Sequence, residues 1–269
     1  SMSGSFEDVV SENNIVGNKY GVRLDHASNS IVGNNITNNQ VGVKISLSSN
    51  NTFYCNNFIN NSQQVYDDLW DVPYFEPCIN SWDSGIEGNY WNNYNCVDAT
   101  YDGIGDIPYI VDANNTDNYP LMGMFSGFDF TVVNKSYDVT VVSNSTLSSC
   151  IIYCYGAVVY PPSGGLNGNP ENAVSFKVTG VDGIIGFCRV MIPTVLLNDS
   201  VTVYVDGVNT AYTSLPCSNA THHYLYFTYA LSTREVVIVP DFPSILILPL
   251  FMIATLLAVI IYKRKHTMY

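Results

Sequence analysis

An acidic loop between residues 98 and 106 carries the clearest pattern of potential metal ligands in this sequence. Oxygen-bearing groups recur at alternate positions, which is how a calcium-binding loop wraps its cation. They are Asp98, Thr100, Asp102, the carbonyl of Ile104 and Asp106. Tyr109 stands where such a loop carries its bidentate carboxylate, so Asp112 or Asp117 would have to complete the site. The pattern predicts bound calcium, with a turn-rich acidic loop that needs no metal as the alternative.

Two basic residues and a carboxylate form a second candidate site. Arg23 lies between Val22 and Leu24, so it faces outward on a strand, and Lys44 takes the same phase one repeat later. Asp25 follows at the corner. Lyases with a β-helix fold use an outward rung of this kind. The second carboxylate of a hydrolase pair is absent, so we favour a solvated charge rung over catalysis.

Aromatic residues crowd between positions 70 and 94, and three of them are candidate ligand-binding residues: Trp82, Trp91 and Tyr94. Exposed rings of this kind can stack on the apolar faces of sugars. Buried rings would close the end of a core instead, and large aromatics contribute most through burial. We therefore favour a cap over a sugar platform, and keep the platform as the alternative.

The element that must position these groups is a repeat of 21 to 22 residues. Residues 13–24 align without a gap with residues 34–45, and a third copy begins at Asn56. Coiling the chain once per period stacks equivalent residues into columns. The predicted columns are Ile15, Ile36 and Phe58, then Val22, Val43 and Val65, with an amide ladder of Asn18, Asn39 and Asn61.

The repeat, of the type N-N-x-I-x-x-N-x-x-G-V-x-L in residues 8–66, resembles that of the NosD-like family. The segments 88–94, 102–109 and 117–121 are similar to a module that follows such repeats in exported archaeal surface proteins. The resemblance implies a right-handed parallel β-helix of the carbohydrate-binding and sugar-hydrolase type. The family's association with copper is not carried over, because no Met/His/Cys cluster stands at ligand spacing.

The chain is expected to be all-β with five parts. Residues 1–66 are predicted to be β-helix coils, and residues 67–125 a cap module with the acidic loop. Alternating apolar runs and the Asp206-Gly207 hairpin signal predict an antiparallel sandwich over 126–240. Its motifs are similar to an Ig-like domain. Residues 244–262 are predicted to be a transmembrane helix and 263–269 a cytoplasmic tail.

The membrane anchor is predicted from one uncharged apolar segment, residues 244–262, followed at once by Lys263, Arg264 and Lys265. The segment is long enough to span a bilayer, and the basic cluster should remain cytoplasmic with everything before it outside. No export signal is visible in residues 1–12, although Val10 stands 21 residues before Ile31, as in an earlier coil. We therefore expect the chain to be the C-terminal part of a longer protein.

A net charge of −13 excludes a nucleic-acid partner, because phosphate binding needs a basic face. Repeated N-x-S/T sequons fit an exported, glycosylated surface. The 7 cysteines suggest disulfides in an oxidising compartment. The expected pairs are Cys78 with Cys96, and one of Cys150 or Cys154 with Cys188 or Cys217, leaving Cys55 unpaired.

Together these features predict a membrane-anchored surface protein that acts in glycan binding or adhesion, and they favour a role without catalysis. Two alternatives stay open. One is a polysaccharide lyase or hydrolase whose active coils lie upstream of residue 1. The other is a structural envelope protein without a specific ligand.

Overall fold

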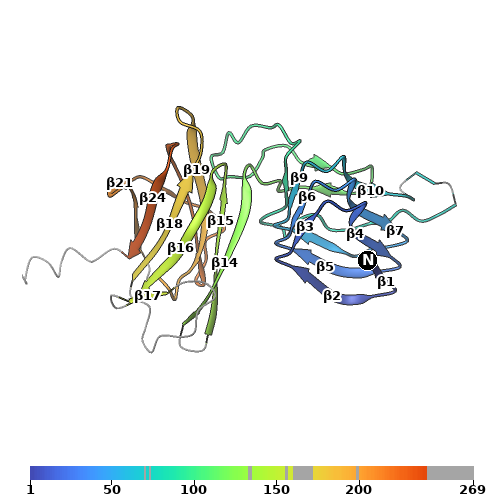
Figure 1. Cartoon of the computed structure of the whole chain (residues 1–269), viewed down its shortest axis with the longest axis horizontal. Coiled ribbons are helices and arrows are strands. Elements are labelled where there is room, and N and C mark those ends of the chain that lie inside the picture. Colours follow the sequence, from blue (N-terminus) through green and yellow to red (C-terminus); the bar gives the residue numbers. More distant parts are fainter. Residues whose placement is uncertain are drawn as a thin grey trace, which may run out of the picture.

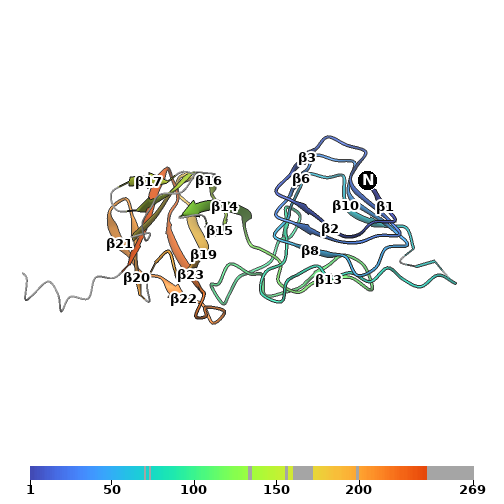
Figure 2. The same cartoon turned by 90° about the horizontal axis from the view of Figure 1, so that it is seen from below.

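The computed structural model describes residues 1–240, apart from positions 70, 73, 133–134, 155–156, 160–171 and 198–199. Every regular element in this part of the chain is a β-strand. Figures 1 and 2 show two lobes, with the N-terminal coils in one and long antiparallel strands in the other. The predicted all-β class is therefore confirmed for the described residues.

The N-terminal lobe is a parallel β-solenoid of about three turns with three faces. The first sheet, in spatial order, contains β1 (Met2–Ser3), β4 (Tyr20–Asp25), β7 (Val41–Ser46) and β10 (Gln63–Asp67). The second contains β2 (Phe6–Ser11), β5 (Ser28–Val32) and β8 (Thr52–Tyr54). The third contains β3 (Asn14–Val16), β6 (Asn35–Thr37), β9 (Asn57–Ile59) and β11 (Tyr90–Trp91).

The predicted apolar columns form the core of this solenoid. Ile15, Ile36 and Phe58 are register partners, as are Val22, Val43 and Val65. Ile36, Val43 and Phe58 are fully buried. Stacking of equivalent residues, as the repeat predicts, is confirmed.

Asparagine ladders run along the corners between the strands. The predicted ladder is present: the Asn18 N–H donates to Asn39 Oδ1 at 2.8 Å, and the Asn39 N–H to Asn61 Oδ1 at 2.9 Å. Two longer ladders accompany it: Asn13, Asn34, Asn56, Asn89 and Asp117; and Asn29, Asn51, Asn80 and Asn115. Each side-chain oxygen in these ladders thus accepts a backbone N–H of the preceding coil.

These longer ladders show that the coil pattern continues beyond residue 66, where the sequence repeat was expected to break down. Asn80 and Asn89 hold the ladder positions although the spacing has grown to 29 and 33 residues. The chain forms loops between coils, so the spacing is lost while the geometry is kept. The cap is therefore a fourth, incomplete coil, closed by the hairpin of β12 (Tyr109–Ile110) and β13 (Thr116–Asp117).

The second lobe consists of two antiparallel sheets. One contains β14 (Met124–Val132), β15 (Lys135–Ser143), β19 (Ile185–Pro193), β23 (His222–Ala230) and β22 (Thr213–Ser214). The other contains β17 (Ala157–Val159), β16 (Thr146–Cys154), β18 (Asn172–Thr179), β24 (Arg234–Pro240), β20 (Val201–Val205) and β21 (Val208–Thr210). One buried apolar cluster joins the inner faces of both sheets, so the predicted sandwich is present.

The hairpin predicted at Asp206-Gly207 joins β20 to β21, with Val205 opposite Val208. Both turn residues have positive φ, 49° for Asp206 and 75° for Gly207. A two-residue turn of this hand matches the twist of the strands it connects, which is why the Asp-Gly pair is informative.

The expected disulfide pairs are wrong for the cysteines whose side chains the structure describes. Cys78 and Cys96 are both free, as are Cys150, Cys188 and Cys217. The side chain of Cys154 lies outside the described part of the structure. Cys78 is buried, and its Sγ accepts the Ser48 N–H at 3.4 Å, which is a hydrogen bond between neighbouring coils. This contact between coils, not a disulfide, explains the position of Cys78.

The predicted transmembrane segment, residues 244–262, lies outside the described residues. Within the described part of the chain, no helix is long and apolar enough to cross a membrane.

Candidate functional site

The incomplete fourth coil leaves one edge of the solenoid uncovered. Over the second sheet, Ser81 forms a parallel bridge with Thr52, and over the third, β11 pairs with β9. Over the first sheet no strand of the described residues follows β10, so β10 is the terminal strand there. The chain turns away at Asn92 and Asn93, the corner at which a strand over β10 would begin. A sheet edge presents unpaired backbone donors and acceptors.

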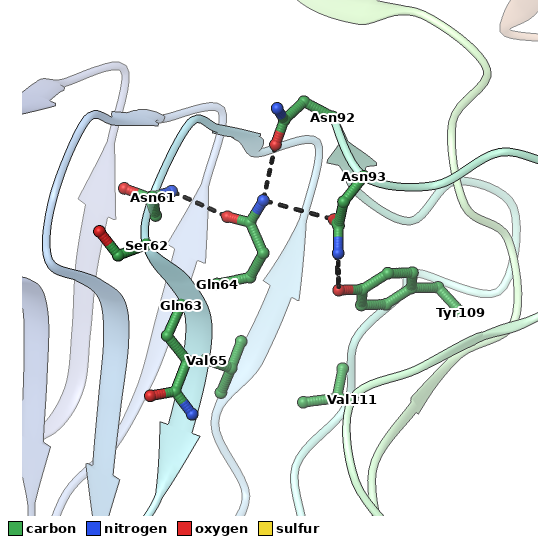
Figure 3. Close-up of a pocket in the computed structure, with 9 residues that line it drawn as sticks. All are labelled: Asn61, Ser62, Gln63, Gln64, Val65, Asn92, Asn93, Tyr109 and Val111. Carbon is green, nitrogen blue, oxygen red and sulfur yellow. Dashed lines mark hydrogen bonds between the residues drawn. The ribbon is translucent and has the colours of Figure 1, made fainter.

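A groove lies along this uncovered edge, between β10 and the segment 109–113. We call it the β10 groove. Its first half is a pocket of about 410 Å³. Figure 3 shows its walls, with the side chains of β10 on one side and Tyr109 and Val111 on the other. The lining residues are Asn61, Ser62, Gln63, Gln64, Val65, Asn92, Asn93, Tyr109 and Val111.

A chain of side-chain hydrogen bonds holds the amides of this half in place (Figure 3). The Asn61 Nδ2 donates to Gln64 Oε1 at 2.9 Å, and the Gln64 Nε2 donates to Asn92 Oδ1 at 2.7 Å and Asn93 Oδ1 at 3.3 Å. The Asn93 Nδ2 donates to the Tyr109 hydroxyl at 3.2 Å. The amides thus have fixed orientations before any ligand arrives.

The second half of the groove is acidic. It forms a pocket of about 420 Å³ that shares Gln63, Val65 and Val111 with the first half. Its further lining residues are Tyr66, Asp67, Ile110, Asp112 and Ala113. No lysine, arginine or histidine lines either half among the described residues. The groove therefore changes from neutral amide to carboxylate along its length, around an apolar middle.

Among the described residues that line the amide half, Tyr109 is the only titratable one. Burial raises its pKa, and the hydrogen bond with Asn93 partly offsets that effect. A phenol with a raised pKa remains protonated at neutral pH. This half can therefore donate and accept hydrogen bonds, but it holds no pair of groups for acid–base chemistry.

The candidate ligand-binding aromatics Trp82, Trp91 and Tyr94 do not line the β10 groove among its described residues. Trp82 is 0% exposed and Trp91 is 1% exposed, and they stack on Phe53 and Phe58 of the preceding coil. Their rings are thus part of the core and offer no face to a sugar, which corrects the platform alternative for both. The Tyr94 ring is partly exposed, and its hydroxyl donates to the Ile107 carbonyl. The rings of Tyr94 and Tyr109 meet in a T-shaped contact.

The predicted charge rung is present: Arg23 and Lys44 are register partners on β4 and β7. Arg23 forms an ion pair with Asp25 at 3.4 Å, and Lys44 one with Asp68 at 3.2 Å. The Lys44 ammonium also lies over the ring of Tyr66. Each basic group is therefore paired with a carboxylate, and a catalytic role for this rung stays a prediction.

The acidic loop is organised by its own backbone. Asp98 accepts the N–H groups of Asp102 and Gly103 at 3.0 and 2.8 Å, and Asp106 accepts that of Ala99 at 2.6 Å. The Thr100 hydroxyl lies 3.4 Å from an Asp98 oxygen and 3.3 Å from an Asp106 oxygen. These bonds bring Asp98, Thr100 and Asp106 together.

Asp102 has a different role from these three residues, because its Oδ1 accepts the Ile104 N–H at 2.8 Å. Within the described residues, no group of three or more His, Cys, Asp or Glu is arranged to hold a metal ion. Calcium binding by the loop stays a prediction.

The sequence did not identify the β10 groove. Asn61 and Val65 were assigned to the repeat, and Asn92, Asn93 and Tyr109 to the cap, so only folding shows that they meet. The sequence held one sign of this site. Asp67 falls at the repeat position of Leu24 and Ile45, and it is the first polar residue in that column.

The comparisons with known proteins agree with the geometry. Residues 1–96 match the family model described as periplasmic copper-binding protein (NosD). This match covers the solenoid and the part of the cap that extends its ladders. Residues 1–96 form a NosD-like parallel β-helix. No curated protein and no solved structure matches the chain significantly.

The NosD-like β-helix contains the amide half of the groove up to Asn93, whereas Tyr109 and Val111 lie beyond the matched residues. The copper in the family's description belongs to that family. Cys55, Cys78 and Cys96 are the cysteines within the match. Cys55 donates to Glu87 Oε2 at 3.7 Å, and in the described part of the chain neither residue belongs to a group of three or more His, Cys, Asp or Glu arranged to hold a metal.

Proposed function

We propose that the protein is a cell-surface binding or adhesion module whose β10 groove binds glycan chains. Residues 244–262 would anchor it in the membrane, and the sandwich, as an Ig-like stalk, would hold the β-helix outside. The observation that carries this proposal is the uncovered edge of β10, lined by oriented amides. A fourth coil that leaves one face open creates a groove suited to an extended ligand.

The chemistry of the groove supports a glycan. Sugar hydroxyls both donate and accept hydrogen bonds, and so do the amides of Gln64, Asn92 and Asn93. Val65, Val111 and the Tyr109 ring provide the apolar contacts that a sugar face needs. The absence of an acid–base pair in the amide half favours binding without cleavage.

Binding and cleavage are tested together on the intact chain in detergent. We expect immobilised neutral polysaccharides to retain the protein without forming new chain ends. Asn93→Ala should weaken retention about tenfold, since one bidentate amide contact is worth roughly 1.4 kcal/mol. Asn209→Ala is the matched control, because Asn209 is an exposed amide on the sandwich. Equal loss in both variants, or new chain ends, would overturn the proposal.

The anchor is tested separately. We expect the chain to stay with membranes in alkaline carbonate, and a chain ending at residue 243 to be released. Release of both would contradict the anchor and leave the groove unaffected.

The calcium prediction for the acidic loop is tested by melting. Calcium should raise the melting temperature of the intact chain and have no effect on Asp98→Asn, since Asp98 would supply the first ligand of the loop. An unchanged melting temperature in the parent protein would remove the prediction.

A further inference from the structure

Asp67 is the one polar residue in an apolar column of the β-helix. It is the register partner of Ile45, which pairs with Leu24 in the coil before. Leu24 and Ile45 are fully buried, and Asp67 is only 4% exposed. A carboxylate in this position has lost most of its hydration, and burial raises its pKa accordingly. An aliphatic residue would continue the column without that loss.

Half of this carboxylate has no hydrogen-bond partner. Asp67 Oδ1 accepts the Leu69 N–H at 2.9 Å. The Cys78 thiol, a weak donor, lies beside this carboxylate, but the buried Oδ2 has no partner within hydrogen-bond geometry. Asp68 Oδ1, on the next residue, is also buried without a partner. The nearby Lys44 ammonium lies 3.2 Å from Asp68 Oδ2 and makes no hydrogen bond to Asp67 Oδ2. An unsatisfied buried acceptor is unfavourable and needs an explanation.

Asp67 lines the acidic half of the β10 groove, together with Asp112 across from it. The Asp112 oxygens accept from Asn114 N and Asn115 Nδ2, so this carboxylate is fixed in orientation. No basic side chain among the described residues lines the groove to neutralise either charge. Asp67 therefore has one carboxylate oxygen without a hydrogen-bond donor, and no cationic side chain among the described lining residues balances its charge.

We infer that the acidic half of the β10 groove binds a protonated amino group of the ligand, so that the glycan is one that carries free amines. An ammonium group has three N–H donors and a positive charge, which meets both deficits at Asp67. A hydroxyl supplies a donor without the charge. An acidic glycan would place like charges together, which is unfavourable.

This inference rests on the proposed function, since the amide half must bind the neutral part of the same chain. The two halves share Val65 and Val111, so one extended ligand can occupy both. An amide-lined half beside an acidic half therefore fits a sugar polymer with hydroxyls along its length and an amine at one position.

The test compares three oligosaccharides of equal length on the intact chain: glucosamine, N-acetylglucosamine and galacturonate oligomers. By titration calorimetry, we expect the glucosamine oligomer to bind at least tenfold more tightly than its acetylated counterpart. The galacturonate oligomer should bind most weakly. Asp67→Asn should abolish the preference for the amine and leave binding of the acetylated oligomer unchanged. Asp112→Asn should reduce the same preference and serves if Asp67→Asn does not fold.

Asp182→Asn is the control, because Asp182 is an exposed carboxylate on the sandwich. A preference that falls equally in this control would show general charge attraction and overturn the inference. So would equal affinity for the amine and acetylated oligomers, although glycan binding would then still stand. Failure of every oligosaccharide, with binding of a lysine-containing extended peptide that Asp67→Asn abolishes, would overturn the inference and the proposed function together.

Discussion

Arg189 of the sandwich and Glu87 of the cap form a buried ion pair, with Nε 3.0 Å from Oε1. The two side chains are 3% and 11% exposed. The guanidinium also donates to the Asp102 carbonyl at 2.9 Å, so one arginine joins β19 to the acidic loop as well. The two lobes are therefore connected by a desolvated charge pair in addition to the hydrogen bonds between Asn57 and Phe125.

Glu87→Ala should destabilise the protein by about 3 to 5 kcal/mol, because it leaves the Arg189 charge buried and unpaired. The matched control is Arg234→Ala, which breaks the half-exposed pair with Asp206 at 2.8 Å and leaves the Asp206 turn in place. That exposed pair should contribute at most about 1 kcal/mol. Urea denaturation of both variants measures the difference. Similar losses in the two variants would show that burial does not strengthen the interface pair.

Asn34→Ala should cost on the order of 2 to 3 kcal/mol, because Asn34 is fully buried within a ladder. Its Oδ1 accepts the Asn13 N–H at 3.0 Å, and its Nδ2 donates to the Val10 carbonyl at 2.8 Å. Truncation leaves both backbone groups without partners. Asn209→Ala, at an exposed amide, should change the stability by less than about 0.5 kcal/mol. If the two variants unfold alike, the ladder does not stabilise the solenoid.

Asp117 should make stability depend on pH. Burial raises its pKa to about 6, and the N–H groups of Trp91, Asn89 and Tyr119 only partly offset this. Because the folded pKa exceeds the unfolded one, its stabilising contribution is complete below about pH 4 and is lost as the pH rises through 6. The loss is roughly 3 kcal/mol.

Asp117→Asn should remove that part of the pH dependence, which denaturation at pH 4 and pH 7 would measure. Asp138, whose pKa burial and Asp129 raise to about 6, titrates in the same range and is retained in the variant. The difference between parent and variant therefore isolates Asp117. Identical slopes would contradict the assignment.

Asp67→Leu should stabilise the protein by about 1 kcal/mol, since it continues the column of Leu24 and Ile45 and removes a desolvated carboxylate. The lost bond to the Leu69 N–H limits the gain. The expected rise in melting temperature is about 2 to 4 °C for a chain of this size. A lower melting temperature would show that the bond to Leu69 outweighs the desolvation, and that Asp67 needs no ligand to explain it.

The sequence predicted the solenoid well for a local reason. Ile15, Ile36 and Phe58 stand at one phase of the repeat, and equal spacing forces equivalent residues to stack. The same reasoning failed at Asn80 and Asn89, because loops change the spacing along the chain without changing the positions of the ladders. A disulfide between Cys78 and Cys96 was expected to cross-link the cap, whereas both are free and Cys78 accepts the Ser48 N–H.

What the sequence by itself determined is therefore the set of local and periodic features: the coils, their columns, the Asn18 ladder, and the Asp206-Gly207 hairpin. Tertiary structure decided which aromatics are covered, with Trp82 and Trp91 inside the core, and which edge stays open. The β10 groove exists because the chain turns away at Asn93 and returns at Tyr109. Contacts of this kind depend on where distant segments meet, and no residue spacing encodes that distance.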